Sequence, residues 1–126
     1  MRQVIQTDKG PKALAFYSQA IVHNGIVYVA GQIPLDPATQ QLIEGDVQAQ
    51  AERVLENVKG ILEASGSGME HALKVSVFLQ DMNDFARMNE VYGRYFAVDP
   101  PARTTVQVAR LPRDVKIEID CIAALK

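Results

Sequence analysis

The 126-residue chain has few of the side chains that bind metals or form disulfides. Its one cysteine, Cys121, excludes an intrachain disulfide and lies in the apolar run 117–125, where we expect a buried and unreactive thiol rather than a reactive one. The two histidines, His23 and His71, are far apart and belong to no cluster with ligand spacing. We therefore expect no metal site.

Long apolar stretches and runs of basic residues are also absent. No run of about 18 apolar residues and no charged-then-apolar leader is present, so we expect a cytoplasmic protein that has no membrane partner. The net charge is -2, and the densest basic group is only Arg103, Arg110 and Arg113, which argues against a nucleic acid partner. With 48% hydrophobic and 22% charged residues, the composition and length suit one globular domain, residues 1–126.

The periodicity of apolar residues predicts the order β-β-α-β-α-β-β. Asn24-Gly25 lies between two β-rich runs and indicates a hairpin. After Asp46, the expected N-cap, apolar residues recur at helical spacing until Gly66 and Gly68 end the pattern. We therefore expect an α+β fold with two helices packed on one face of a mixed sheet. The expected strands are 16–22, 26–31, 73–79, 103–109 and 115–124, and the expected helices are 46–65 and 83–96.

The last two strands carry polar residues at alternate positions. Arg103 and Thr105 alternate with apolar residues in one strand, and Glu118 does so in the other. We interpret all three as lying on the sheet face opposite the helices. That face is either washed by solvent, as is common in antiparallel sheets, or an intersubunit surface that contains a ligand site.

Asn89 lies on the apolar stripe of the second predicted helix, between Phe85 and Tyr92. A buried amide there needs hydrogen-bond partners, or it costs about 1–3 kcal/mol. Its partner is either another side chain of the chain or a substrate.

Several short motifs resemble the reactive intermediate deaminase family, also called RidA or YjgF. Each motif is weak alone, but their order along essentially the whole chain is specific. The motifs are Tyr17-Ser18-Gln19-Ala20, Ala30-Gly31-Gln32-Ile33-Pro34, Met82-Asn83-Asp84-Phe85, Pro101-Ala102-Arg103-Thr104-Thr105-Val106, Val108-Ala109-Arg110-Leu111-Pro112 and Lys116-Ile117-Glu118-Ile119.

The resemblance implies a chorismate-mutase-like fold and a homotrimer with clefts between subunits. It also implies hydrolysis of 2-imino and enamine acids, such as 2-iminobutanoate and 2-iminopropanoate, to 2-oxo acids and ammonia, without cofactor or metal. By position, Arg103 matches the arginine that holds the substrate carboxylate, and Glu118 matches the acidic residue that positions or activates water. The other cleft residues would be Tyr17, Gly31, Asn89 and Thr105, and Thr105 stands where many members have cysteine.

The strand order of the family implies that Gly31 ends one strand while Arg103 begins a parallel one. On this interpretation they lie at opposite ends of the sheet, about 20 Å apart, so that two subunits are needed to bring both to one small acid. Two other functions remain open. One is a non-enzymatic binder of small carboxylates, and the other, disfavoured by the acidic charge balance, is a translation-inhibiting endoribonuclease.

Overall fold

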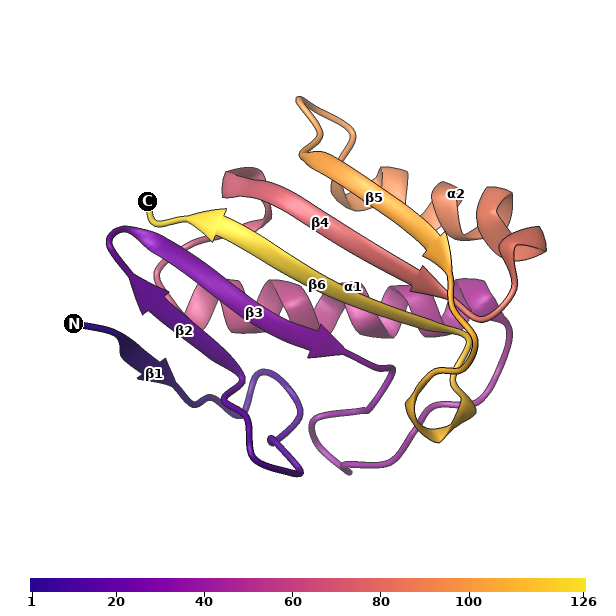
Figure 1. Cartoon of the computed structure of the whole chain (residues 1–126), viewed down its shortest axis with the longest axis horizontal. Helices are drawn as coiled ribbons and strands as arrows, with labels where there is room; N and C mark the ends of the chain where they lie inside the picture. Colours follow the sequence, from indigo (N-terminus) through magenta and orange to yellow (C-terminus); the bar gives the residue numbers. More distant parts are fainter.

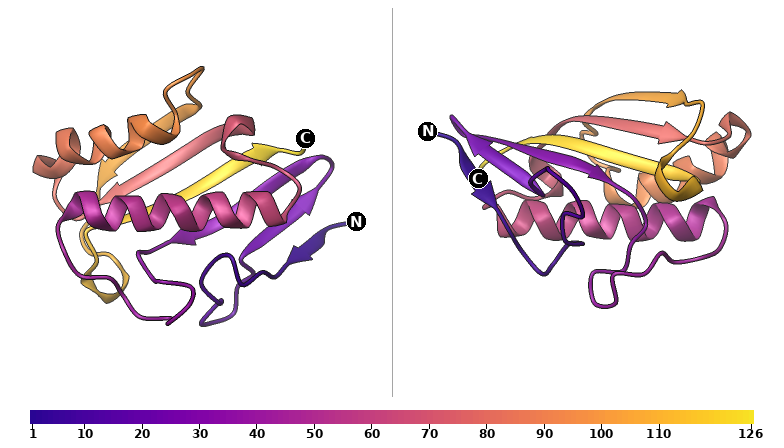
Figure 2. Two further views of the ribbon diagram at one scale, coloured as in Figure 1. Left: turned by 180° about the vertical axis from the view of Figure 1, so that it is seen from behind. Right: turned by 60° about the horizontal axis from the view of Figure 1, so that its bottom comes forward.

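Two α-helices pack against one face of a six-stranded sheet in the computed structural model, which describes residues 1–126 (Figures 1 and 2). This arrangement confirms the predicted α+β class. In chain order the strands are β1 (Gln3–Ile5), β2 (Ala20–His23), β3 (Ile26–Gln32), β4 (Ala72–Leu79), β5 (Ala102–Gln107) and β6 (Ile117–Ala124), and the helices are α1 (Val47–Ala64) and α2 (Phe85–Tyr95).

The predicted hairpin joins β2 and β3. Asn24 and Gly25 both have positive φ angles, 50° and 77°, as the favoured two-residue hairpin turn requires. Two details of the prediction are wrong. The first hairpin strand begins at Ala20 rather than at residue 16, and an additional strand, β1, pairs antiparallel with β2. With three residues, β1 is too short to show an alternating pattern.

The two helices begin and end close to the predicted residues. The Asp46 side chain caps α1 by accepting a hydrogen bond from the Ala49 backbone N–H at 3.0 Å. The turn after α1 contains Gly66 at φ 87°, a conformation that favours glycine. A short 3-10 helix, Met82–Asp84, leads into α2. No helix combines the length and the apolar character that crossing a membrane requires.

The sheet has the strand order β1-β2-β3-β6-β4-β5 (Figure 1). The last strand in the sequence, β6, lies near the centre and is antiparallel to both β3 and β4. The edge strand β5 is parallel to β4, so the sheet is mixed. This edge strand carries Arg103 and Thr105, and α2 lies over the same side of the sheet (Figure 2).

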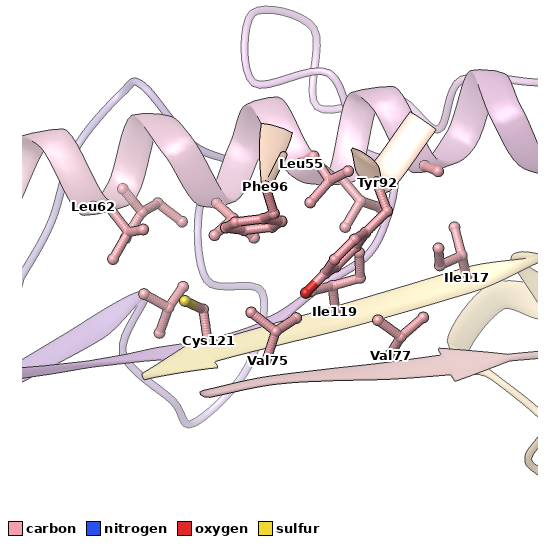
Figure 3. Packing of buried hydrophobic residues seen from close by; sticks show 14 of the residues in the cluster. Leu55, Leu62, Val75, Val77, Tyr92, Phe96, Ile117, Ile119 and Cys121 are labelled. Atoms are coloured by element: carbon pink, nitrogen blue, oxygen red, sulfur yellow. The ribbon is translucent and has the colours of Figure 1, made fainter. Parts of the chain in front are cut away.

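The hydrophobic core lies between the helices and the sheet. Leu55 and Leu62 of α1 face Val75 of β4 and Ile119 of β6, and all four side chains are fully buried (Figure 3). The other face of the sheet has no helix over it. Tyr28 and Val106 are exposed there, at 45% and 39% of their surface. The structure therefore has one face with an apolar core and one open face.

Candidate active site

Arg103 lies on the helix-covered side of the sheet. In the parallel pairing of β5 with β4 it is level with Val75, whose side chain is fully buried beneath the helices. The Arg103 Cζ atom lies 4.5 Å from the centroid of the Tyr92 ring and 5.4 Å from that of Phe85. The prediction that Arg103 and Thr105 share the open face with Glu118 is therefore wrong. The alternation of polar and apolar residues shows which residues of β5 share a face of the sheet. The register of β5 with β4 decides which of the two faces that is.

Asn89 holds the Arg103 guanidinium from α2. Its Oδ1 atom accepts a hydrogen bond from Arg103 Nη1 at 2.7 Å. The Asn89 side chain is exposed, so its predicted place within the buried stripe is wrong: it lies at the border of that stripe. The hydrogen bond within the chain is present, and a contact with substrate stays a prediction.

The guanidinium of Arg103 has unused hydrogen-bond donors. It is partly buried, makes no ion pair, and donates one side-chain hydrogen bond, to Asn89. An arginine side chain has five N–H donors arranged to bind a carboxylate through two parallel hydrogen bonds. The arrangement can therefore bind a small carboxylate while Asn89 remains in place.

Two hydroxyl groups near Arg103 are buried without a hydrogen-bond partner. They are the Oγ1 atom of Thr105, two residues along the same strand, and the phenolic oxygen of Tyr92. Burial raises the pKa of the Tyr92 phenol, and the nearby positive charge of Arg103 opposes that increase. Because Thr105 points to the same side of β5 as Arg103, its hydroxyl can meet a ligand held there.

Glu118 lies on the open face, in contact with Gly31. The neighbours of Glu118 in β6, Ile117 and Ile119, are fully buried beneath the helices, so Glu118 points the other way. A β-carbon at residue 31 would overlap the Glu118 Oε2 atom. Glycine at this position leaves room for the Glu118 carboxylate, which approaches its backbone closely.

The Glu118 carboxyl group has no hydrogen bond or ion pair to stabilise its charge. Burial raises its pKa above the ordinary value, and the negative charge of Asp120 raises it further. Both residues point to the open face, because they are two positions apart in one strand. A carboxylate with a raised pKa is a stronger base once it is ionised, which suits proton transfer from water.

Tyr17 lies beside the same end of β3 as Gly31. The β2–β3 pairing extends by one hydrogen bond, from the Ala30 N–H to the Gln19 carbonyl at 2.9 Å, and Tyr17 precedes Gln19 by two residues. The Tyr17 hydroxyl accepts a hydrogen bond from the Leu14 N–H at 3.3 Å. Its side chain lines an open hollow of about 630 Å³ formed largely by the N-terminal segment.

The six predicted site residues thus form two groups. Arg103, Thr105 and Asn89 lie between β5 and α2. Glu118 and Gly31 belong to β6 and β3, and Tyr17 lies in the segment that precedes β2.

The predicted distance along the strands between Arg103 and Gly31 is wrong. Arg103 is level with Val75, Cys121 and Val29, and Gly31 is only two residues beyond Val29. The two are instead separated across the sheet by three strand spacings, roughly 14 Å. Arg103 also points to the face opposite Glu118. One copy of the chain therefore does not bring the two groups to one small molecule.

Sequence reasoning missed the contacts that Phe85 and Tyr92 make with Arg103. Both were expected only as core residues. Their spacing with Asn89, at i, i+4 and i+7, places the three on one side of α2 and could have indicated a shared partner. Asp120 was missed as the charge next to Glu118. The chain has no group of three or more His, Cys, Asp or Glu side chains placed to hold a metal ion.

Comparisons with known proteins agree with this architecture. The family model described as Endoribonuclease L-PSP matches residues 7–125. The Reactive Intermediate Deaminase A, chloroplastic, of Arabidopsis thaliana is 44% identical over 124 residues, which cover 98% of this chain and 66% of that protein. RidA from an Antarctic Psychrobacter superposes with a TM-score of 0.94 at 46% identity, over 98% of this chain and 99% of that one. TdcF of E. coli with bound serine superposes with a TM-score of 0.93 at 43% identity, again over 98% and 99%.

Proposed function

Because the chain belongs to the endoribonuclease L-PSP family, the RidA or YjgF family, we propose that it hydrolyses 2-imino and enamine acids to 2-oxo acids and ammonia. The relatives include a protein named as a reactive intermediate deaminase and a structure with bound serine. Serine carries the same carboxylate next to a nitrogen-bearing carbon as a 2-imino acid does. The expected substrates are 2-iminobutanoate and 2-iminopropanoate.

The observation that carries this proposal is the unpaired Arg103 guanidinium. It is partly buried, fixed by Asn89, and has no carboxylate of the protein as its partner. Two of its free N–H groups would hold the substrate carboxylate and thereby orient the plane of the adjacent C=N bond. The Thr105 hydroxyl, buried without a partner, would donate a further hydrogen bond to the same substrate.

The reaction then needs one water molecule and one base. An iminium carbon is already electrophilic, so no serine or cysteine nucleophile is required. Glu118 would accept one proton as the water oxygen bonds to the C=N carbon of the iminium, giving a carbinolamine, and would return that proton to the nitrogen. As the C–N bond breaks and the C=O bond forms, the remaining hydroxyl proton would pass to the departing ammonia, which leaves as ammonium. The products are the 2-oxo acid and ammonia, so the reaction needs neither a metal nor a redox cofactor.

The complete site requires two copies of the chain. Within one copy Arg103 and Glu118 lie on opposite faces of the sheet, and three strand spacings, roughly 14 Å, separate Arg103 from Gly31 across it. We propose a homotrimer in which Arg103, Asn89 and Thr105 of one subunit face Tyr17, Gly31 and Glu118 of the next. The open sheet face, with exposed Tyr28 and Val106, would supply apolar contact area between subunits.

The direct test is an imine-trapping assay. A threonine dehydratase generates 2-iminobutanoate in the presence of semicarbazide, which traps the imine unless it is hydrolysed first. Addition of the protein should reduce the trapped fraction in proportion to its concentration. If the protein binds 2-oxobutanoate but does not reduce trapping, it is a carboxylate binder and the proposed hydrolysis is wrong.

A further inference from the structure

We propose that Tyr92, assisted by Phe85, is a positioning residue that fixes the Arg103 guanidinium in the orientation a substrate carboxylate needs. The effect of this role on catalysis rests on the proposed function, whereas the contact between Arg103 and the two rings is observed in the structure. The Arg103 Cζ atom is 4.5 Å from the Tyr92 ring centroid and 5.4 Å from that of Phe85. Both distances lie within the range over which a cation is attracted to an aromatic ring.

The rings supply a restraint that the hydrogen bond alone does not. Asn89 fixes one nitrogen of the guanidinium, Nη1, and leaves the group free to rotate about that contact. Two rings close to the same Cζ atom restrict this rotation. Arginine loses much rotamer freedom when its end is held in one place. Because the side chain loses this conformational entropy on folding and not on ligand binding, more of the interaction energy remains for binding the carboxylate.

Tyr92 suits this role because its own position is rigid. Only 5% of its surface is exposed, and its ring packs against that of Phe96 with the centroids 4.7 Å apart. Figure 3 shows the ring reaching from α2 toward the strands that carry Val75 and Ile119. Phe85, Asn89 and Tyr92 project from one helix, so α2 presents all three contacts to Arg103 as one unit.

The proposal assigns the role to the ring and not to the hydroxyl. The Tyr92 oxygen is buried and makes no hydrogen bond. Tyr92→Phe keeps the ring and removes this unpaired polar atom, so its affinity for 2-oxobutanoate should stay within about twofold of the parent. Tyr92→Leu removes the ring, and its affinity should fall about 5- to 30-fold.

The matched control is Phe96→Leu, an aromatic-to-leucine change in the same cluster. Phe96 is 6% exposed and packs on Tyr92, but it makes no contact of this kind with Arg103. We expect Phe96→Leu to lower the unfolding temperature about as much as Tyr92→Leu while changing 2-oxobutanoate affinity by no more than about twofold, because leucine still packs against the Tyr92 ring. In the trapping assay Tyr92→Leu should raise KM with little change in kcat, because the carboxylate is held equally in substrate and transition state.

The experiment combines calorimetric titration of 2-oxobutanoate with NMR of the Arg103 Nε–Hε signal in the assembled protein. Ring currents should displace this signal in the parent, in Tyr92→Phe and in Phe96→Leu, and the displacement should shrink in Tyr92→Leu. Parent-like binding and an unshifted signal in Tyr92→Leu would overturn the proposal. If Tyr92→Leu does not assemble, Phe85→Leu carries the same test, with an expected loss of affinity of about two- to fivefold.

The NMR signal separates this proposal from the proposed function. A parent protein that neither binds 2-oxobutanoate nor hydrolyses the imine refutes the function. The positioning of Arg103 still stands in that case if the signal responds to Tyr92→Leu and not to Phe96→Leu.

Discussion

The Glu118 carboxylate occupies the space that a β-carbon at residue 31 would fill. The contact joins the β-bulge of β3, between Val29 and Gln32, to the beginning of β6 on the open sheet face. Any residue other than glycine at position 31 must push the end of the Glu118 side chain away. This relationship makes the position of the proposed base testable without changing the base itself.

Gly31→Ala should leave the protein folded, because the flexible end of Glu118 can move aside. Displacement of the base should lower kcat about 10- to 100-fold, since misplacement by about 1 Å can cost that much. The measurement is steady-state kinetics in the trapping assay. Gly93→Ala is the matched control, because a β-carbon there would meet nothing within 4 Å and α2 should tolerate it. Equal kcat values for the two variants would remove Glu118 from the mechanism.

The pH dependence of kcat should report the ionisation of Glu118. Burial and then the charge of Asp120 raise its pKa above 4.5, so activity should decline, as the pH falls, at a higher pH than for an ordinary glutamate. Asp120→Asn removes the neighbouring negative charge and should move this decline to lower pH. Glu118→Gln should lower kcat about 10²- to 10⁴-fold, change 2-oxobutanoate binding less, and abolish the decline. If the decline of kcat at low pH does not move in Asp120→Asn, the ionisation that causes it belongs to a group other than Glu118.

The sequence predicted those elements whose residue pattern is long or distinctive, and it did not predict the very short ones. The stripe of α1 and the Asn24-Gly25 turn are strong local signals, and both were confirmed. The three-residue strand β1 has no periodicity to detect. The near-central place of β6 could not be derived from the hydrophobic patterns, because they do not determine which strands pair.

The candidate site was predicted as a set of residues but not as an arrangement in space. Alternation correctly grouped Arg103 with Thr105, yet it could not show which face of the sheet they occupy. That choice depends on the register of β5 with β4 and on the side from which α2 packs. Likewise the helical stripe identified Tyr92 as buried, whereas only the structure shows which of its neighbours carries a charge.

The mass in solution should be about three times 13.9 kDa. A trimer is expected because the two groups of site residues lie on opposite faces of one chain, and cyclic symmetry joins them in every subunit. Light scattering coupled to size exclusion gives the mass at micromolar concentration. A monomer that hydrolyses the imine at full rate would contradict the intersubunit site.

Prolonged treatment with a chelator should leave the hydrolysis rate unchanged. The proposed reaction uses Arg103 for binding and Glu118 for proton transfer, and neither step involves a metal. The measurement compares the treated protein, dialysed free of chelator, with untreated protein in the trapping assay. Loss of activity that zinc or manganese restores would show that the mechanism omits an essential group.

Arg103→Ala tests the central claim most directly. Loss of one partner of a desolvated charge pair costs about 2–5 kcal/mol, which corresponds to roughly two to four orders of magnitude in kcat/KM. The variant should still assemble, because Arg103 lies at the edge of the core. Arg103→Lys should recover only part of the activity, since an ammonium group cannot form the two parallel hydrogen bonds. The decisive measurement is the fraction of 2-iminobutanoate trapped by semicarbazide with each variant. We predict that Arg103→Ala leaves trapping nearly as high as without protein, and an assembled Arg103→Ala protein that clears the imine at the parent rate would contradict the carboxylate anchor.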